Sequence, residues 1–214
     1  LTDICTGWTE LEAVPNKAQV WVFEAIQTIR ERLPFPLRGL DSDNGSEFIN
    51  GQLLRYCQQE RLTFTRARPY RKNDNCYVEQ KNYSVVRQTV GYQRFDTTKE
   101  LMVLQQLYAT LRLYTNFFQP SMKLKSKERF GSRVKKSYHA PQTPYQRVLA
   151  CAEVTLADKK RLQRQYRQLN PAALKRELDK QRQELFRLAA KKRPPKLKRH
   201  MNQKSLQIKP HLWT

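Results

Sequence analysis

The first third of the chain alternates short β-prone runs with one stretch of helical periodicity. Residues 1–5 and 8–14 are rich in Thr, Ile, Trp and Val and flank a tight turn, which predicts a β-hairpin. In residues 16–33 the apolar positions recur every three or four residues, behind the capping residue Asn16. The pattern therefore predicts a hairpin and then a helix that packs one face on a sheet.

The next apolar runs predict a strand–helix–strand unit and then a long helix. Residues 37–41 and 62–66 have the composition of strands, with a short helical pattern between them. Strands joined through a helix are expected to run parallel, so the fold class is α/β. A helix over residues 98–118 follows, capped by Thr97 or Thr98. Its expected buried stripe is Leu104, Leu107, Tyr108, Leu111 and Phe118.

Beyond residue 118 the chain becomes basic and its apolar pattern weakens. Residues 121–140 show no period and predict an irregular segment, whereas Thr143-Pro144-Tyr145-Gln146 has the cap, proline and glutamine of a helix start. Two further basic stretches of helical spacing follow, and we expect them to pair. These changes divide the chain into a core (1–118), a basic linker with a short helix (119–150), a basic helical hairpin (151–193) and a basic disordered tail (194–214).

Charge divides the chain at almost the same place. Residues 1–120 hold 15 Lys and Arg against 13 Asp and Glu, whereas residues 121–214 hold 26 against 6, so +20 of the net +22 lies in the second part. Such a polycation binds phosphate chains by releasing counterions, and nucleic acid is the expected partner. A solvated or ribosome-like basic tail is the alternative. An anionic membrane surface is disfavoured, because the basic helices lack a broad apolar face.

Cysteine usage and hydropathy indicate a cytoplasmic protein. The four cysteines show no spacing typical of zinc sites, and we expect reduced thiols. No apolar run approaches the ~18 residues that span a bilayer, so no membrane contact is expected.

Two carboxylates stand at the ends of predicted rigid elements. Asp43 comes directly after the strand of residues 37–41, and Glu79 lies near the start of a predicted helix over residues 75–92. Carboxylates are ligands of divalent metal ions, and this pair suits metal binding beside a phosphate chain. Other interpretations stay open: Asp43 as a turn-forming residue with Asp41 as the rival ligand, and Glu79 as a partner of the helix dipole.

A basic loop precedes Glu79 and leads into this helix. Arg71, Lys72 and Asn73 lie in the loop and suit contacts with a DNA backbone, the alternative being a merely solvated loop. Glu79 and Asn82 project into the apolar arc of the helix, where burying a carboxylate alone costs several kcal/mol. Metal and DNA contacts would explain polar groups there. The apolar residues of this arc are Val78, Tyr83, Val85, Val86 and Val90.

The residues around the two acids resemble a known family. They are similar to the second half of the DDE integrase and transposase core, as in retroviral integrases and bacterial insertion-sequence transposases. The resemblance covers about residues 1–118 and extends more loosely to residue 145. It implies that Asp43 and Glu79 are catalytic metal ligands and that Asn82 holds DNA. The matching motifs are Asp43-Asn44-Gly45-Ser46-Glu47-Phe48, Arg68-Pro69-Tyr70 with Asn73-Asp74, and Val78-Glu79 with Asn82.

The same resemblance implies a ribonuclease-H-like mixed sheet with flanking helices, followed by a basic helical C-terminal extension. In this family one more strand precedes the hairpin and carries the first catalytic Asp. We therefore expect the chain to lack its first strand, to be truncated at its N-terminus and to be inactive alone. Asp3 is not assigned as the first acid, because the family's Asp before Thr-Gly-Trp lies on the second strand.

The function implied is DNA transposition or integration by a polynucleotidyl transferase. Two Mg²⁺ ions, or Mn²⁺ in their place, would serve cleavage of an element end and joining of its 3′-OH to target DNA. The expected partners are element-end and target DNA and further copies of the chain, in the bacterial cytoplasm beside the nucleoid. Two alternatives stay open: a non-catalytic DNA-binding remnant of a transposase, and a ribonuclease-H-like nuclease that only hydrolyses.

Overall fold

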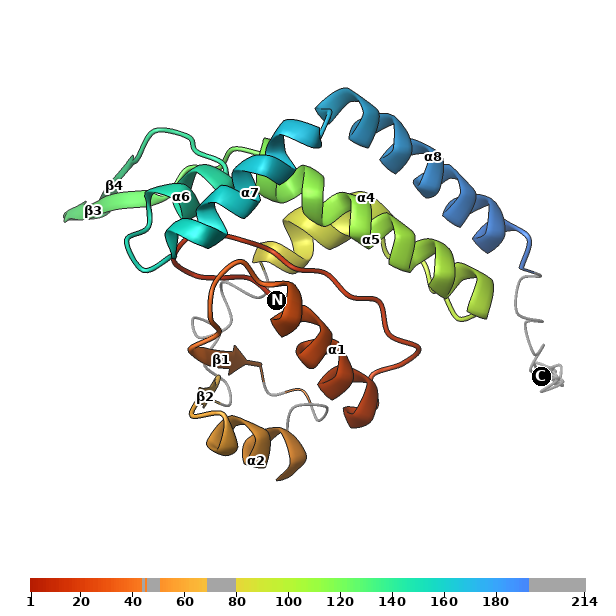
Figure 1. Ribbon diagram of the computed structural model, residues 1–214. Helices are drawn as coiled ribbons and strands as arrows, with labels where there is room; N and C mark the ends of the chain where they lie inside the picture. Colours follow the sequence, from red (N-terminus) through yellow and green to blue (C-terminus); the bar gives the residue numbers. More distant parts are fainter. Residues whose placement is uncertain (44, 46–50, 69–79, 193–214) are drawn as a thin grey trace, which may run out of the picture.

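The computed structural model describes residues 1–43, 45, 51–68 and 80–192. These residues form an α/β structure in which two pairs of strands are combined with several helices. In Figure 1 a lower part contains the first two strands and helices, and an upper part contains the long helices, with the second pair of strands projecting to one side. The lower part consists of α1 (Gln19–Arg32), β1 (Gly39–Ser42), α2 (Gly51–Gln59) and β2 (Thr63–Arg66).

The strands β1 and β2 confirm the predicted parallel unit. They pair in parallel, with Gly39 opposite Thr63 and Ser42 opposite Arg66, and α2 lies between them in the sequence. The helix buries Leu53 and Cys57 against α1 and the strands. The periodicity of these segments was sufficient to predict the unit because each element buries its own apolar face locally.

The N-terminal hairpin is shorter than predicted. Thr2 and Thr9 form a single antiparallel bridge, and the main-chain N–H of Asp3 donates to the carbonyl of Trp8 at 2.8 Å. On its other side Thr9 exchanges two hydrogen bonds of 2.8 Å with the side-chain amide of Asn116, which takes the place of a neighbouring strand. The described strands therefore form separate pairs rather than the expected single mixed sheet.

The helix after the basic loop contains a π-helical segment. Within the predicted range, η3 (Asn82–Arg87) is π-helical and α4 (Gln88–Val90) continues it as an α-helix. Val85 and Val90 are buried as predicted, but Tyr83 is 58% exposed and Asn82 is also exposed. The wider π turn changes the angle between successive side chains, so an arc calculated for an α-helix places both residues wrongly.

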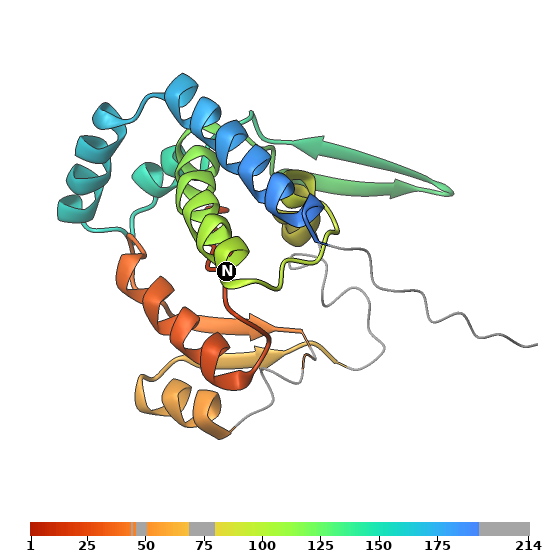
Figure 2. The same cartoon turned by 90° about the vertical axis from the view of Figure 1, so that its right-hand side faces the viewer.

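The long helix α5 (Thr98–Phe118) packs against the last helix, α8 (Pro171–Ala190), and the two lie side by side in Figures 1 and 2. Leu107 and Leu185 are fully buried in the apolar cluster that joins them. The predicted pairing of the last two helices as a hairpin in residues 151–193 is therefore wrong. The extension is part of the main core and not an appendage to residues 1–118.

A second apolar cluster joins the N-terminal segment to the two short helices. Trp8 and Phe117 meet edge to face at 5.5 Å between ring centroids. Tyr145 and Val148 come from α6 (Pro144–Ala150), whose predicted capping box at Thr143 is confirmed. Leu162 comes from α7 (Leu156–Gln168). The cluster therefore fixes α6 and α7 to the body of the molecule.

The segment predicted to be irregular is a β-hairpin. Residues in β3 (Leu124–Phe130) pair antiparallel with β4 (Arg133–Tyr138), and Gly131 turns between them with φ of +60°. The hairpin extends away from the helices in Figure 2. Sequence periodicity missed it because neither face is buried, so no alternation of apolar and polar residues marks the strands.

The described part of the chain contains three cysteines, and its helices can be checked for membrane-spanning length and hydropathy. Cys5, Cys57 and Cys151 are free thiols. Among the helices described, none is both long enough and apolar enough to cross a membrane.

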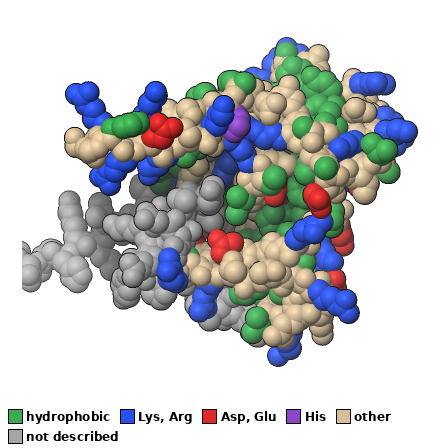
Figure 3. All heavy atoms as spheres, turned by 90° about the vertical axis from the view of Figure 1, so that its left-hand side faces the viewer, with side chains coloured by type: hydrophobic (Ala, Val, Ile, Leu, Met, Phe, Trp, Pro, Cys, Tyr) green, Lys and Arg blue, Asp and Glu red, His purple; other side chains and the backbone are tan. Residues whose placement is uncertain are grey.

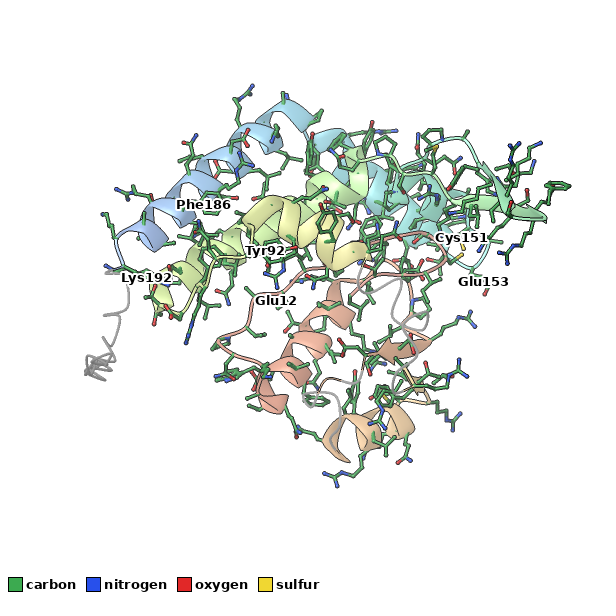
Figure 4. The ribbon with its side chains drawn as sticks, turned by 180° about the vertical axis from the view of Figure 1, so that it is seen from behind. Glu12, Tyr92, Cys151, Glu153, Phe186 and Lys192 are labelled. Atoms are coloured by element: carbon green, nitrogen blue, oxygen red, sulfur yellow. The ribbon has the colours of Figure 1, made fainter. Side chains whose placement is uncertain are left out.

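Glu100 ties the first turn of α5 to the end of α8. Its buried Oε2 accepts hydrogen bonds from the N–H and hydroxyl of the N-cap Thr97, both at 2.9 Å. Lys192, labelled at the end of α8 in Figure 4, places its Nζ 2.7 Å from the same carboxylate. Burial alone raises the pKa of Glu100, but the contacts from Lys192, Thr97 and Asp96 outweigh it and lower the pKa to about 2.

We expect the Glu100→Gln variant to be less stable by about 2 kcal/mol at pH 7, because it loses hydrogen bonds to a charged group. The lowered pKa means that the carboxylate stabilises the fold above pH 4.5 and that this contribution is lost as the pH falls toward 2. The difference in free energy of unfolding between wild type and variant should therefore shrink between pH 7 and pH 3. Urea unfolding at both pH values measures it, and a difference independent of pH would contradict the assignment.

Candidate metal and nucleic-acid site

Asp43 stands at the carboxyl end of β1, as predicted. It follows Ser42, the last residue of the strand, and it is half-buried. Its Oδ1 accepts the main-chain N–H of Gly45 at 3.0 Å, which is the turn contact that the alternative interpretation anticipated. That hydrogen bond also orients the carboxylate, as the outer contacts of metal ligands do. The turn contact and a ligand role are therefore compatible.

Asp41, the rival ligand, has a different partner. It is exposed in the middle of β1, and its Oδ1 accepts the hydroxyl of Thr65, its neighbour across the parallel pair, at 2.6 Å. Asp41 therefore takes part in a contact between strands, whereas Asp43 lies past the end of the pair.

The segment with the other predicted residues leaves the sheet at the same edge. The pair Ser42 and Arg66 closes the parallel ladder, and the N–H of Ala67 donates to the carbonyl of Ser42 at 2.9 Å. The chain after Ala67 thus starts beside the residue that precedes Asp43. Four predicted residues of this segment lie outside the described residues: Arg71, Lys72, Asn73 and Glu79.

Three cations lie together where this segment ends. Lys81 is half-buried, and burial lowers the pKa of its amine, with further lowering by the charges of Arg147 and Lys123. Burial and Arg147 likewise lower the pKa of Lys123. The three residues come from the helix after the basic loop, the start of the β-hairpin and α6. Asn82, the predicted DNA-holding residue, follows Lys81 and is exposed.

Two of these cations also hold the N-terminal turn. Lys123 donates to the carbonyls of Ile4 and Cys5, and the guanidinium of Arg147 donates to the carbonyl of Thr6 at 3.2 Å. The turn itself is closed by Asp3, whose Oδ2 accepts the N–H and the hydroxyl of Thr6. Asp3 therefore has a local structural partner in the turn.

Lys123 and Arg147 line a hollow of about 320 Å³ together with His139, Ala140 and Gln142. Figure 3 shows basic side chains around a histidine where the β3–β4 hairpin joins the body. Apart from main-chain carbonyls and a serine, the structure gives Lys123 and Arg147 no hydrogen-bond partner within the described part of the chain. A hollow lined by cations in this way favours an anionic ligand such as a phosphate group.

The acids do not form a larger cluster in the range that the structure describes. Within residues 1–43, 45, 51–68 and 80–192, no three side chains of His, Cys, Asp and Glu gather as a metal site would require. Asp43 is therefore the described member of the predicted ligand pair.

The sequence interpretation missed the cation cluster. Lys81 lies two residues after Glu79, which was a usable signal, but Lys123 and Arg147 are remote in sequence and no local pattern singles them out. Only the packing of α6 beside the N-terminal turn brings them to Lys81.

Comparison with known proteins gives similarity without a function. No family model matches the chain. A protein of Sinorhizobium fredii (strain NBRC 101917 / NGR234), named "Uncharacterized protein y4rM", is 47% identical over 147 residues, which is 69% of this chain and 42% of that relative. The chain thus spans less than half of the relative's length, and the relative's name records no activity.

Proposed function

We propose that this chain belongs to the catalytic part of a DNA transposase or integrase, a metal-dependent polynucleotidyl transferase with a ribonuclease-H-like core. The whole enzyme cleaves the end of a DNA element and joins the freed 3′-OH to a target strand. Asp43 and Glu79 hold the metal ions, and Arg71, Lys72, Asn73 and Asn82 hold the DNA end. The motifs around the two acids, which resemble those of the DDE family, first suggested this reaction.

The observation that carries the proposal is the edge at which β1 and β2 end. Asp43 follows β1 there, and the chain leading to Glu79 leaves from β2, tied to Ser42 through Ala67 at 2.9 Å. Carboxyl ends of neighbouring parallel strands are the usual place for a site in an α/β sheet. The segment then returns to the described structure at the cation cluster around Lys81. An acid and several cations thus flank the segment at its two ends.

The described residues fit a hard divalent cation. Asp43 offers carboxylate oxygens at a half-buried position and is oriented by the N–H of Gly45, while Asp41 adds negative charge two residues earlier in the chain. Paired Mg²⁺ ions, when bound, stabilise the entering and leaving oxygens of an in-line displacement at phosphorus.

The protein's own part is to bind and orient the DNA. The cations Lys81, Lys123 and Arg147 lie where the described chain resumes after residue 79, and they attract the phosphate chain. Their burial leaves them incompletely solvated, which strengthens their interaction with a phosphate. Exposed Asn82 is available to the DNA end at the start of the same helix.

A joining assay tests the proposal. A labelled duplex with a free 3′-OH is incubated with plasmid DNA and Mg²⁺, using this chain and a version extended upstream. Joined products that depend on Mg²⁺ are expected from the extended protein. The same reaction with EDTA is the control, and it should give no product.

Two other outcomes would replace the proposal. Cleavage without joining, with either protein, would identify a ribonuclease-H-like nuclease that only hydrolyses. Tight DNA binding with neither cleavage nor joining in Mg²⁺ and Mn²⁺ would identify a DNA-binding remnant.

A further inference from the structure

The β3–β4 hairpin projects from the body as an arm with no buried face (Figures 1 and 2). Of its residues, only Ser126 and Ser137 are even half-buried, and their hydroxyls contact each other across the strands at 2.7 Å. A two-stranded hairpin in water is marginally stable by itself. Packing against the body therefore does not explain why the arm extends from it.

The arm is strongly basic, and two of its positive charges face each other across the strands. Its basic residues are not ion-paired to any residue in the described part of the chain. Lys127 stands directly opposite Lys136, and like charges at opposed positions destabilise a strand pair. These basic residues are Lys125, Lys127, Arg129, Arg133, Lys135 and Lys136, against the single acid Glu128.

The same arm exposes large apolar side chains. Phe130, at the turn beside Gly131, is 63% exposed, and Val134 and Tyr138 follow along β4 at 43% and 48%. Isolated apolar residues on a surface need no explanation, but here three of them lie among the cations of one projecting element. A partner of this arm must therefore be polyanionic and must also offer apolar or aromatic surface.

The arm continues into the cation-lined hollow. At its base the N–H of His139 donates to the carbonyl of Lys123 at 2.9 Å, and both residues line the hollow with Arg147. Positive charge thus runs from the turn of the arm to the cluster at Lys81. An extended polyanion matches this path better than a small ion does.

We propose that the β3–β4 hairpin is a DNA-binding arm that lies in the major groove of duplex DNA. That groove is wide enough to admit a two-stranded β-ribbon, so the basic side chains reach the phosphates on both sides. Phe130 at the turn contacts bases or sugars. DNA neutralises the opposed Lys127 and Lys136, so binding removes their repulsion. The inference takes its partner, DNA, from the proposed function and adds the structural element that binds this DNA.

The test compares two variants of the full chain that each remove two positive charges. Lys127→Gln with Lys136→Gln changes the arm, and Arg176→Gln with Lys180→Gln changes exposed positions on α8. Fluorescence anisotropy with a labelled 30-base-pair duplex gives the affinity over a range of salt concentrations. We expect the arm variant to bind at least about 10-fold more weakly at 0.1 M salt and to lose up to about 1.8 from the slope of log K against log salt, since each phosphate contact adds about 0.9.

The α8 variant should lose clearly less affinity, and the arm variant should melt no lower than wild type because it removes a repulsion. Phe130→Ala should weaken binding without changing the salt slope. Equal losses of affinity in the two charge variants would mean that only the net charge matters and not its place on the arm, which would overturn the proposal. Wild-type affinity in the arm variant would overturn it as well. The proposal would also be overturned if the arm were needed for binding to phosphatidylserine vesicles but not for binding to the duplex.

These outcomes are separable from the proposed catalytic function. A chain that binds duplex DNA through the arm but joins no DNA strands leaves the arm proposal standing and removes the enzymatic one. If the arm variant joins strands as well as wild type does, the arm proposal is overturned and the enzymatic proposal stands.

Discussion

Replacing Asp43 with Asn in the version extended upstream is expected to lower cleavage and joining of DNA by more than about 100-fold. Outer contacts of a metal site already cost 10-fold to 100-fold when they are removed, and a ligand costs more. Asn keeps the size of the side chain and an oxygen that can accept the N–H of Gly45, now 3.0 Å from the carboxylate, so the turn is preserved. The charge is what the variant removes. DNA affinity should stay close to wild type, because it depends on the basic residues.

Asp41→Asn is the matched control, because it removes the same charge two residues earlier. An Asn at position 41 still accepts the hydroxyl of Thr65, now at 2.6 Å. Joining by the extended protein in Mg²⁺ should therefore be affected far less than by Asp43→Asn. The reverse order would make Asp41 the ligand, and wild-type joining by both variants would remove the proposed site. Glu79→Gln should behave as Asp43→Asn does, and rescue of either by Mn²⁺ would weaken the ligand role without reassigning it.

Replacing Glu10 with Gln is expected to destabilise the fold by about 3 kcal/mol. The side chain of Glu10 is fully buried and joins three parts of the chain. Its carboxylate accepts the Nε–H of Arg32 at 2.8 Å and of Trp8 at 2.9 Å, and it lies 3.2 Å from the guanidinium of Arg112. Removing one member of a buried ion pair costs about 3–5 kcal/mol. The lower end applies, because the side chains of Arg32 and Arg112 are 26% and 21% exposed.

The matched control is Glu12→Gln. Glu12 pairs with the same Arg32 at 2.7 Å, but it is itself 22% exposed, and an ion pair near the surface contributes about 1 kcal/mol or less. Urea unfolding followed by circular dichroism gives both values at pH 7. If the two variants lose the same stability, the carboxylate of Glu10 does not organise the junction of the N-terminal segment, α1 and α5.

The sequence alone determined the elements whose signals are local. The capping box at Thr143 was identified from four residues, because the cap and its amide partner bond within one turn, and Thr97, one of the two predicted caps of α5, is the cap observed. The position of Asp43 after β1 followed from an apolar run and the turn behind it. Parallel pairing of β1 and β2 followed from the helix between them. Each of these signals lies within a few residues or in a single connection.

Only the tertiary structure decided which elements meet. α8 packs on α5, where Leu178 and Leu185 share an apolar cluster with Leu107 and Leu111 across more than 60 residues of chain. Asn116, in a helix, completes the hydrogen bonding of Thr9 at a sequence separation of 107, and no periodicity encodes such a partner. The same distinction between local sequence and tertiary packing holds for the acids and cations of the candidate site. The motif located Asp43, but Lys81, Lys123 and Arg147 come together only because their elements pack around the N-terminal turn, and charge has no sequence period that would announce it.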